Sequence, residues 1–192
     1  MPLPVSIERE LLHIRHIDLR GYRRVDGLYD IEGRVTDTKE HPFRRPATDV
    51  DVAPGTPLHD MWIRLVVDED LVIHDIVAVT DASPHAVCPE AAATLMQLKG
   101  ARIGPGWTRF VKERLGGRHS CTHLMELLMP IATAAYQTLS PVRLAKPDEL
   151  GPTGRPLKID SCYAYAGDGQ LVKKLWPQFH VKRKSHAGAA ND

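Results

Sequence analysis

In the first part of the chain, hydrophobic and polar residues alternate with the two-residue period of β-strands. Residues 13–24 and 28–38 follow this pattern around Val25-Asp26-Gly27, where Asp-Gly is a hairpin turn signal. On the second strand one face carries Tyr29, Ile31, Gly33 and Val35, and the other face is mostly polar. This alternation predicts a β-hairpin in an antiparallel sheet with one buried face.

A second predicted hairpin joins residues 59–67 to residues 71–80 through an acidic turn. Its expected inward positions are Met61, Ile63, Leu65 and Val67 on the first strand and Leu71, Ile73, Val77 and Val79 on the second. His59 continues the first stripe and Asp75 interrupts the second. An unpaired polar group in such surroundings costs about 1–3 kcal/mol, so both side chains need partners. Residues 40–57, between the hairpins, are proline-rich and aperiodic, which predicts a long loop.

The period changes to that of α-helices in the second half of the chain. Helices are predicted at 89–98, 107–115 and 121–139, with glycines after the first two. The third has an apolar stripe formed by Leu124, Leu127 or Leu128, Ile131, Ala135 and Leu139. Pro130 is expected to kink this helix or to end its first segment near Met129. After residue 140 the sequence is irregular, with a short extended piece and a short helix near 169–175.

These elements predict an α+β fold, an antiparallel sheet of about four strands with about three helices packed on one face. We expect a single domain over residues 1–192. Within it, residues 8–140 form the core and residues 141–180 form a C-terminal arm packed on that core. Residues 181–192 form a flexible tail.

Composition restricts the classes of function. The net charge is +1, which does not favour nucleic-acid binding. No apolar run is long enough for a membrane span, and no signal-peptide core is found near the start. Three cysteines, an odd number, suit a reducing compartment better than a disulfide framework. We therefore expect a cytoplasmic protein with a small-molecule substrate and no nucleic-acid or membrane partner, and a homo-oligomer is left open.

The stretch from Gly117 to Leu139 carries the most suggestive chemistry. Ser120 is expected to cap the helix, which places Cys121 and His123 in its first turn. Exposed N–H groups and the helix dipole favour a thiolate there. Glu126 lies three residues after His123, on the same side of the helix. A nucleophilic Cys121 activated by His123 or His59 is one reading, with Glu126 as a fourth catalytic candidate.

A bound metal is the other reading. Cys121 and His123 form a C-x-H pair, and His85 and Cys88 form H-x-x-C. Zinc and iron sites use three or four such ligands, although no paired C-x-x-C signature is present. Structural alternatives remain: the cysteines can simply pack in the interior, and His59 can bond a backbone carbonyl.

The motifs of common phosphate-binding and hydrolase sites are absent. The sequence has no G-x-x-x-x-G-K-[ST] loop, no G-x-G-x-x-G after a strand and no G-x-S-x-G elbow. The segment RIGPGW, residues 102–107, precedes a helix and is suited either to an anion site or to a plain proline–glycine turn.

Five segments together resemble the bacterial family known as domain of unknown function 2889. They are RGYRRVDGLYDIEGRVTDTK, PLHDMWIRLVVD, RIGPGW, GGRHSCTHLMELL and IDSCYA followed by GQLVKKLWPQF. The resemblance spans nearly the whole chain and implies a single bacterial domain, with core segments holding His59, Cys121, His123 and Cys162. It implies no reaction, but associates the chain with catabolism of aromatic acids or their acyl thioesters.

Residues and resemblance together predict a small-molecule enzyme of bacterial catabolism, a hydrolase or lyase for an aromatic or acyl substrate. The expected metal ligands, for zinc or iron, are Cys121, His123, His59 and Cys162. The alternative is a non-catalytic ligand-binding or accessory protein, in which these groups are core or sensing residues.

Overall fold

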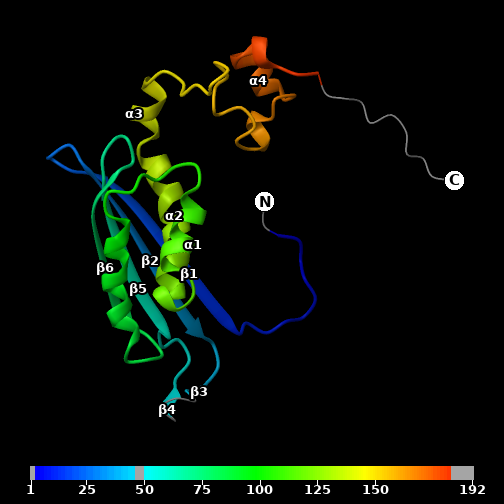
Figure 1. Ribbon diagram of the computed structural model, residues 1–192. Helices are drawn as coiled ribbons and strands as arrows, with labels where there is room; N and C mark the ends of the chain where they lie inside the picture. Colours follow the sequence, from blue (N-terminus) through cyan, green and yellow to red (C-terminus); the bar gives the residue numbers. More distant parts are fainter. Residues whose placement is uncertain (1–2, 46–49, 183–192) are drawn as a thin grey trace. The chain divides into compact units, whose positions relative to one another are not determined.

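The computed structural model describes residues 3–45 and 50–182 and divides the chain into two compact units, Met1–Arg143 and Leu144–Asp192 (Figure 1). The second unit begins close to the start of the predicted C-terminal arm. The packing of that arm on the core stays a prediction, and the predicted tail, 181–192, lies mostly outside the described residues.

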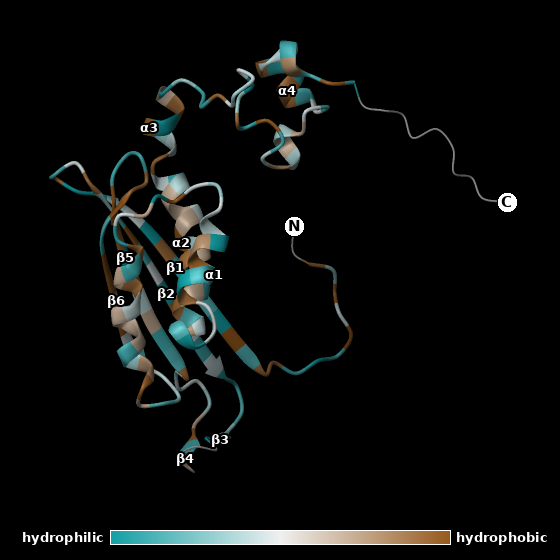
Figure 2. Cartoon of the chain, in the orientation of Figure 1, coloured by the Kyte–Doolittle hydropathy of each residue, from teal (hydrophilic) through white to brown (hydrophobic). Residues whose placement is uncertain are grey.

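The first unit contains a four-stranded antiparallel sheet in the order β1-β2-β5-β6. Its strands are β1 (His13–Arg23), β2 (Tyr29–Lys39), β5 (His59–Val67) and β6 (Ile73–Ala82). Both predicted hairpins are confirmed, and β2 and β5 are the central strands. Figure 2 shows the alternation of hydrophilic and hydrophobic positions along the strands, the pattern expected for a sheet with one buried face.

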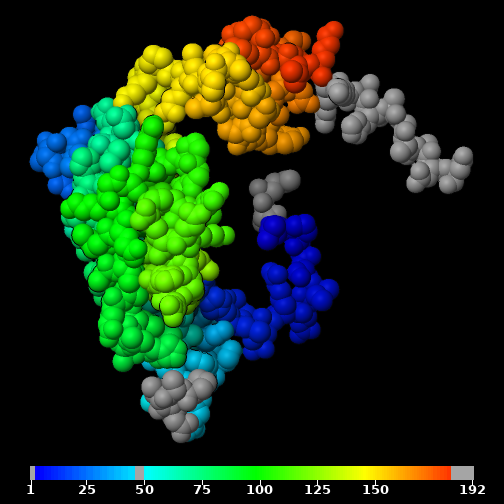
Figure 3. Space-filling model, in the orientation of Figure 1, coloured from blue at the N-terminus to red at the C-terminus, as the bar shows by residue number. Residues whose placement is uncertain are grey.

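A helical layer covers one face of the sheet. It consists of the 3₁₀ helix η1 (Cys88–Leu98), α1 (Trp107–Leu115), the short η2 (Gly117–His119) and α2 (Thr122–Thr138). Helix α2 packs on β1, β2 and β5, whereas η1 packs on β6. In the space-filling view this layer, in green, hides most of the strands (Figure 3). The predicted α+β class is thus confirmed.

Two glycines let α2 approach the sheet closely. A Cβ atom at Gly21 would lie 1.8 Å from the Thr138 hydroxyl, and one at Gly33 would lie 2.6 Å from Ile131. Both glycines lie on the face of the sheet that α2 covers, so any side chain there would push the helix outward. This contact fixes the position of α2, and therefore of the residues at its start, relative to β1 and β2.

The prediction for the inward face of β6 was wrong beyond Ile73. A β-bulge at Val66 and Val67 shifts the register, and Ile76 rather than Val77 becomes buried. Val77 and Val79 are exposed instead. Asp75 is half-exposed and pairs with Lys99 at 3.7 Å, so it does not point into the core. One extra residue in a strand reverses the face of every side chain after it.

Other elements also differ from the prediction. The expected loop at 40–57 contains a short two-stranded sheet, β3 (Phe43–Arg45) with β4 (Val50–Val52). The helix after Pro89 is a 3₁₀ helix, and α2 continues through Pro130 to Thr138. An additional helix, α3 (Ser140–Ala145), follows it at the end of the first unit and the start of the second.

The second unit contains η3 (Tyr163–Tyr165), α4 (Gln170–Leu175) and η4 (Pro177–Phe179). The short helix predicted near 169–175 is therefore confirmed, whereas the extended piece before it forms turns. Asp148 accepts hydrogen bonds from Lys158 and the Trp176 indole, which tie the unit together. In the described parts of both units, the helices are too short or too polar to cross a bilayer.

Candidate functional site

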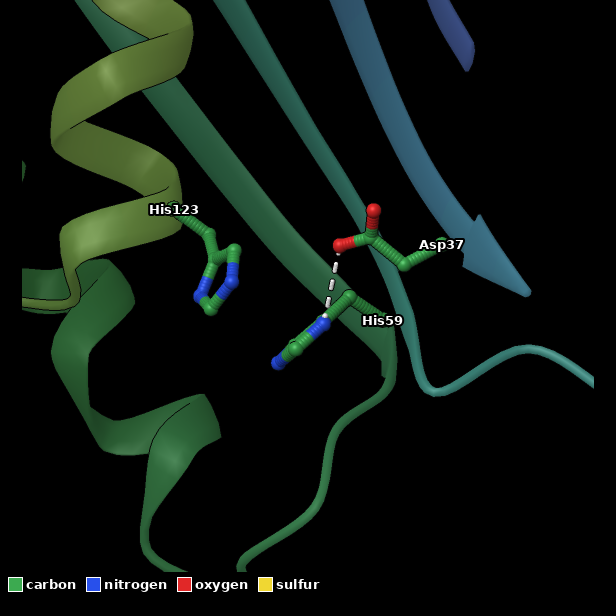
Figure 4. A group of neighbouring side chains, drawn as sticks. All are labelled: Asp37, His59 and His123. Atoms are coloured by element: carbon green, nitrogen blue, oxygen red, sulfur yellow. Dashed lines mark hydrogen bonds and ion pairs between the residues drawn. The ribbon is translucent and has the colours of Figure 1, made fainter. Parts of the chain in front are cut away.

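Three chemically active side chains meet where the two central strands face the start of α2. Asp37 lies near the end of β2, and His59, its direct partner in the antiparallel register, is the first residue of β5. His123 lies in the first turn of α2 and points toward the sheet (Figure 4). Three elements that are distant in sequence therefore contribute to this cluster, which we call the Asp37–His59–His123 cluster.

The carboxylate of Asp37 is surrounded by donors. Its Oδ1 accepts hydrogen bonds from His13 Nε2 at 2.9 Å and from Arg15 Nε at 2.8 Å. Its Oδ2 accepts from Arg15 Nη2 at 2.8 Å and from His59 Nδ1 at 3.0 Å. Burial alone would raise the pKa of Asp37, but the bonds from Arg15 and His13 hold it well below its ordinary value. The group is therefore an anion that only accepts hydrogen bonds.

This anion determines the tautomer of His59. Because the carboxylate can only accept, the hydrogen bond requires the proton of His59 to lie on Nδ1. Burial, followed by the neighbouring His123, lowers the pKa of His59 despite the opposing effect of Asp37. The neutral ring therefore holds its free lone pair on Nε2. An imidazole oriented in this way is suited to act as a base or as a metal ligand.

His123 lies against His59, with ring centroids 3.7 Å apart and planes inclined by 30°. Burial lowers the pKa of His123, and the Arg15 guanidinium contributes in the same direction. Two imidazolium ions at this separation would repel each other strongly. The structure therefore holds a pair of neutral imidazoles side by side.

The histidine pair forms part of the wall of a cavity of about 650 Å³ in the first unit. The polar and sulfur-bearing residues of this wall include His59, His85, Cys88, His119, Cys121 and His123. Its volume is in the range of small-molecule sites. Imidazole and thiol groups are thus concentrated on a surface that a small ligand can reach.

Cys121 is close to the cluster but does not occupy the predicted position in the helix. It is the N-cap residue of α2 rather than part of its first turn, and its side chain makes no capping bond. Its Sγ lies 3.9 Å from His123 Nδ1 and 3.9 Å from Met61 Sδ. The predicted cap, Ser120, instead bonds Thr94 through the two hydroxyl groups at 2.7 Å. The thiol is near the imidazole, but the capping prediction was wrong.

Glu126 reaches the cluster only through an intermediate residue. Its side chain is 61% exposed, and one carboxylate oxygen lies 3.3 Å from Arg15 Nη1. Arg15 therefore links Glu126 to Asp37. Glu126 contributes to the charge balance around the cluster through this contact with Arg15.

His59, His123 and Cys121 were predicted from the sequence, whereas Asp37, Arg15 and His13 were not. The strand alternation that assigned Val35 to the inward face continues to Asp37, and this was the signal available. The predicted ligand Cys162 is exposed and belongs to the second unit. Among the described residues, the group whose ligand atoms come together is Asp37, His59 and His123.

The cluster has dimensions that suit a metal ion. One ligand atom from each of Asp37, His59 and His123 lies within 4.8 Å of the other two. Tetrahedral zinc with bonds of about 2.0–2.1 Å separates its ligands by about 3.3 Å, so binding would draw the side chains together. Each oxygen of Asp37 already accepts two hydrogen bonds, so the two imidazoles are the available ligands and Asp37 is their support. A site with three protein ligands, as in catalytic zinc centres, would need a further side chain from the cavity wall.

Comparison with known proteins identifies the family but no activity. A family model described as a protein of unknown function, DUF2889, matches residues 13–137, which include both hairpins and nearly all of α2. The chain has no match among curated proteins or among solved structures. The match covers more than half of the chain and all three residues of the cluster. This chain therefore belongs to the DUF2889 family.

Proposed function

We propose that the chain is a metal-dependent enzyme that acts on a small molecule, with His59 and His123 as ligands of zinc or iron. The observation that carries the proposal is the pair of adjacent imidazoles, with ring centroids 3.7 Å apart, at the wall of the cavity. Asp37 adds the carboxylate–histidine arrangement that orients metal-binding imidazoles in proteins. Neutral imidazoles need not lose a proton before binding, which favours loading at neutral pH.

Each residue of the cluster has a separate role in this proposal. His59 and His123 would hold the ion, and Asp37 keeps the Nδ1 proton of His59 in place. Arg15 holds Asp37 in its ionised form, so that the carboxylate accepts the hydrogen bond from His59 Nδ1. A metal bound by these residues would supply a Lewis acid and lower the pKa of a bound water.

This chemistry fits hydrolysis or a lyase reaction. Both reactions need a polarised carbonyl or an activated water, which such a metal supplies. The proposal of an aromatic or acyl substrate from bacterial catabolism rests on the family resemblance described above, and the volume of the cavity is compatible with a molecule of this size.

A thiol-dependent reaction is the second candidate. It is favoured by the 3.9 Å separation between Cys121 Sγ and His123 Nδ1, both of which line the cavity. In this version His123 takes the thiol proton, and the Cys121 thiolate attacks an acyl carbonyl and forms a thioester as the leaving group departs with the proton from His123. Water then hydrolyses the thioester and frees the thiol. A reaction with iodoacetamide that depends on His123 would support it over the metal version.

The experiment is a measurement of metal content on protein purified without a metal-affinity tag. Wild type and the control His74→Ala are expected to carry about one zinc or iron per chain. His59→Ala and His123→Ala are expected to lose it while keeping the circular dichroism spectrum of the folded protein. Equal metal content in all four proteins, or none in wild type after exposure to zinc and ferrous iron, would reject the metal site.

Turnover is tested separately on the same proteins. Hydrolysis of simple aryl esters and acyl thioesters by wild type, lost in His59→Ala and in His123→Ala, would support the enzyme. A bound metal without turnover on such substrates would favour the non-catalytic ligand-binding alternative. Cys121→Ser separates the two candidates, because the metal version predicts that this variant keeps its metal.

A further inference from the structure

Beside the Asp37–His59–His123 cluster, the structure brings together donor atoms from Met61, Cys121 and His123. Met61 lies on β5, two residues after His59, so both side chains point to the face of the sheet that α2 covers. Cys121 is the N-cap residue of α2, and His123 lies in its first turn. We call these residues the Met61–Cys121–His123 group. The proposed zinc or iron site uses only His123 of the three.

The thiol of Cys121 is close to both of the other donors in this group. Its Sγ lies 3.9 Å from Met61 Sδ, toward which the thiol donates, and 3.9 Å from His123 Nδ1. A three-coordinate ion with bonds of about 2.0–2.3 Å separates its ligands by about 3.5–4.0 Å. Both measured distances fall within this range. Cys121 and each of its neighbours can therefore share one ion with little movement of the side chains.

The kinds of donor atom in the group select a soft metal. A thioether sulfur carries no charge and binds soft ions such as monovalent copper. Copper sites in proteins combine imidazole nitrogen, cysteine thiolate and methionine thioether, and the group supplies one donor of each kind. The pair of His59 and His123 offers nitrogen donors alone, which suit zinc or iron.

Burial and charge favour a monovalent ion over a divalent one. Met61 is fully buried and Cys121 packs against the hydrophobic core, while Cys121 and His123 also line the cavity of about 650 Å³. An ion can thus enter from the cavity and reach a thioether that water does not contact. A thiolate and one copper(I) ion cancel in charge, whereas a divalent ion would leave a net positive charge in surroundings where charge is costly.

We propose that Met61, Cys121 and His123 form a binding site for monovalent copper. Binding forms copper bonds to Cys121 Sγ, Met61 Sδ and His123 Nδ1, and the thiol proton of Cys121 is released to solvent. The oxidation state of the copper does not change, so the step needs no oxidant or reductant. This site does not rest on the proposed zinc or iron site, but the two share His123. Copper(I) therefore competes with zinc for the chain and inhibits a reaction that depends on zinc.

The test is competition between the full chain and bicinchoninate for copper(I), under nitrogen with ascorbate present. The colour of the copper–bicinchoninate complex reports the copper that the chain has not bound. Wild type is expected to take up about one copper ion per chain. Cys121→Ser should weaken binding at least about hundredfold, because the charged ligand is lost, and Met61→Leu about tenfold. Leucine keeps nearly the volume of methionine, so the core should remain packed.

Matched controls separate the ligands from neighbouring residues. Cys88 lines the same cavity and Met125 packs against the same core, but neither belongs to the group. Cys88→Ser and Met125→Leu should each bind copper(I) within about threefold of wild type. X-ray absorption of the copper complex should find a sulfur ligand in wild type that is missing in Met61→Leu. The proposal is overturned if wild type takes no copper from bicinchoninate, if Cys88→Ser weakens binding as much as Cys121→Ser does, or if Met61→Leu keeps both the affinity and the sulfur ligands of wild type.

Zinc binding by the same variants distinguishes this site from the proposed zinc or iron site. His59→Ala is expected to lose zinc but to keep copper(I) within about threefold, and Cys121→Ser to lose copper(I) but to keep zinc. His123→Ala should lose both ions. Loss of copper(I) and zinc together in every variant would overturn a separate copper site. Copper(I) binding with the expected pattern, in a chain that takes no zinc, would support the copper site and reject the zinc site alone.

Discussion

Two of the histidine–aspartate pairs in the first unit look alike when only their distances are compared. His59 and Asp37 are joined at 3.0 Å, and His74 and Asp68 at 2.7 Å. Their surroundings differ: the His59 side chain is 15% exposed and that of Asp37 is 3% exposed, against 47% and 31% for His74 and Asp68. The pairs also use different ring nitrogens, Nδ1 in His59 and Nε2 in His74.

The other partners of each carboxylate explain the difference in role. Asp68 also accepts the backbone N–H groups of Asp70 and Val72, so it shapes the turn between β5 and β6. Asp37 accepts bonds from Arg15 and two histidines, and its histidine His59 lies against a second imidazole at the cavity wall. A short hydrogen bond does not define a site. Burial and the neighbouring groups decide whether the pair supports a turn or prepares a base or ligand.

Removal of the carboxylate charge should give the largest difference in stability between variants of the two pairs. Asp37→Asn removes the buried charge to which Arg15 donates, while Arg15 stays partly exposed and keeps its pairing with Glu126, so we expect a loss of about 2–3 kcal/mol in the free energy of unfolding. Asp68→Asn can still accept a backbone N–H and should lose about 1 kcal/mol. Urea unfolding monitored by circular dichroism measures both. Equal losses would contradict the distinction.

The contribution of Asp37 to the free energy of unfolding should decrease as the pH falls. Its pKa in the folded chain is below the ordinary value of about 4, so the unfolded chain takes up the proton first. The stability that Asp37 contributes is present above that ordinary value and is lost as the pH falls toward the folded-state pKa. The difference in unfolding free energy between wild type and Asp37→Asn should shrink by about 1–2 kcal/mol between pH 7 and pH 3. A constant difference across this range would refute the assigned direction.

Protonation of His59 is expected to have the smallest effect on the free energy of unfolding. Burial lowers the pKa of His59 in the folded chain, so below about pH 6.5 protons bind preferentially to the unfolded chain. Stability should therefore fall between pH 7 and pH 5.5, and His59→Gln should reduce that fall by about 0.5–1 kcal/mol. His74→Gln is the matched control. A fall that is unchanged in His59→Gln would contradict a neutral, buried His59.

The sequence predicted the individual strands and helices better than the contacts between them. Alternation from Tyr29 to Val35 correctly assigned the buried face of β2, because every second side chain of a strand points the same way. The same rule failed in β6, where the bulge exposes Val77 and Val79, since no residue type marks that bulge.

The candidate site was only partly predictable, because it depends on how separate strands and helices pack together. His59 was expected to need a polar partner, but the partner, Asp37, depends on the register between β2 and β5. The contact of His59 with His123 depends on how α2 lies across the sheet, which Gly21 and Gly33 determine through close approach. Tertiary packing of this kind leaves little trace in local periodicity.

The most direct test of the central claim is nuclear magnetic resonance of the histidine ring nitrogens at neutral pH, before and after addition of zinc. We predict that His59 carries its proton on Nδ1 and His74 on Nε2, as their bonds to Asp37 and Asp68 require. Zinc should shift the signals of His59 Nε2 and of His123 and leave those of His74 in place. A proton on Nε2 of His59, or His59 and His123 signals that do not respond to zinc, would contradict a metal site supported by Asp37.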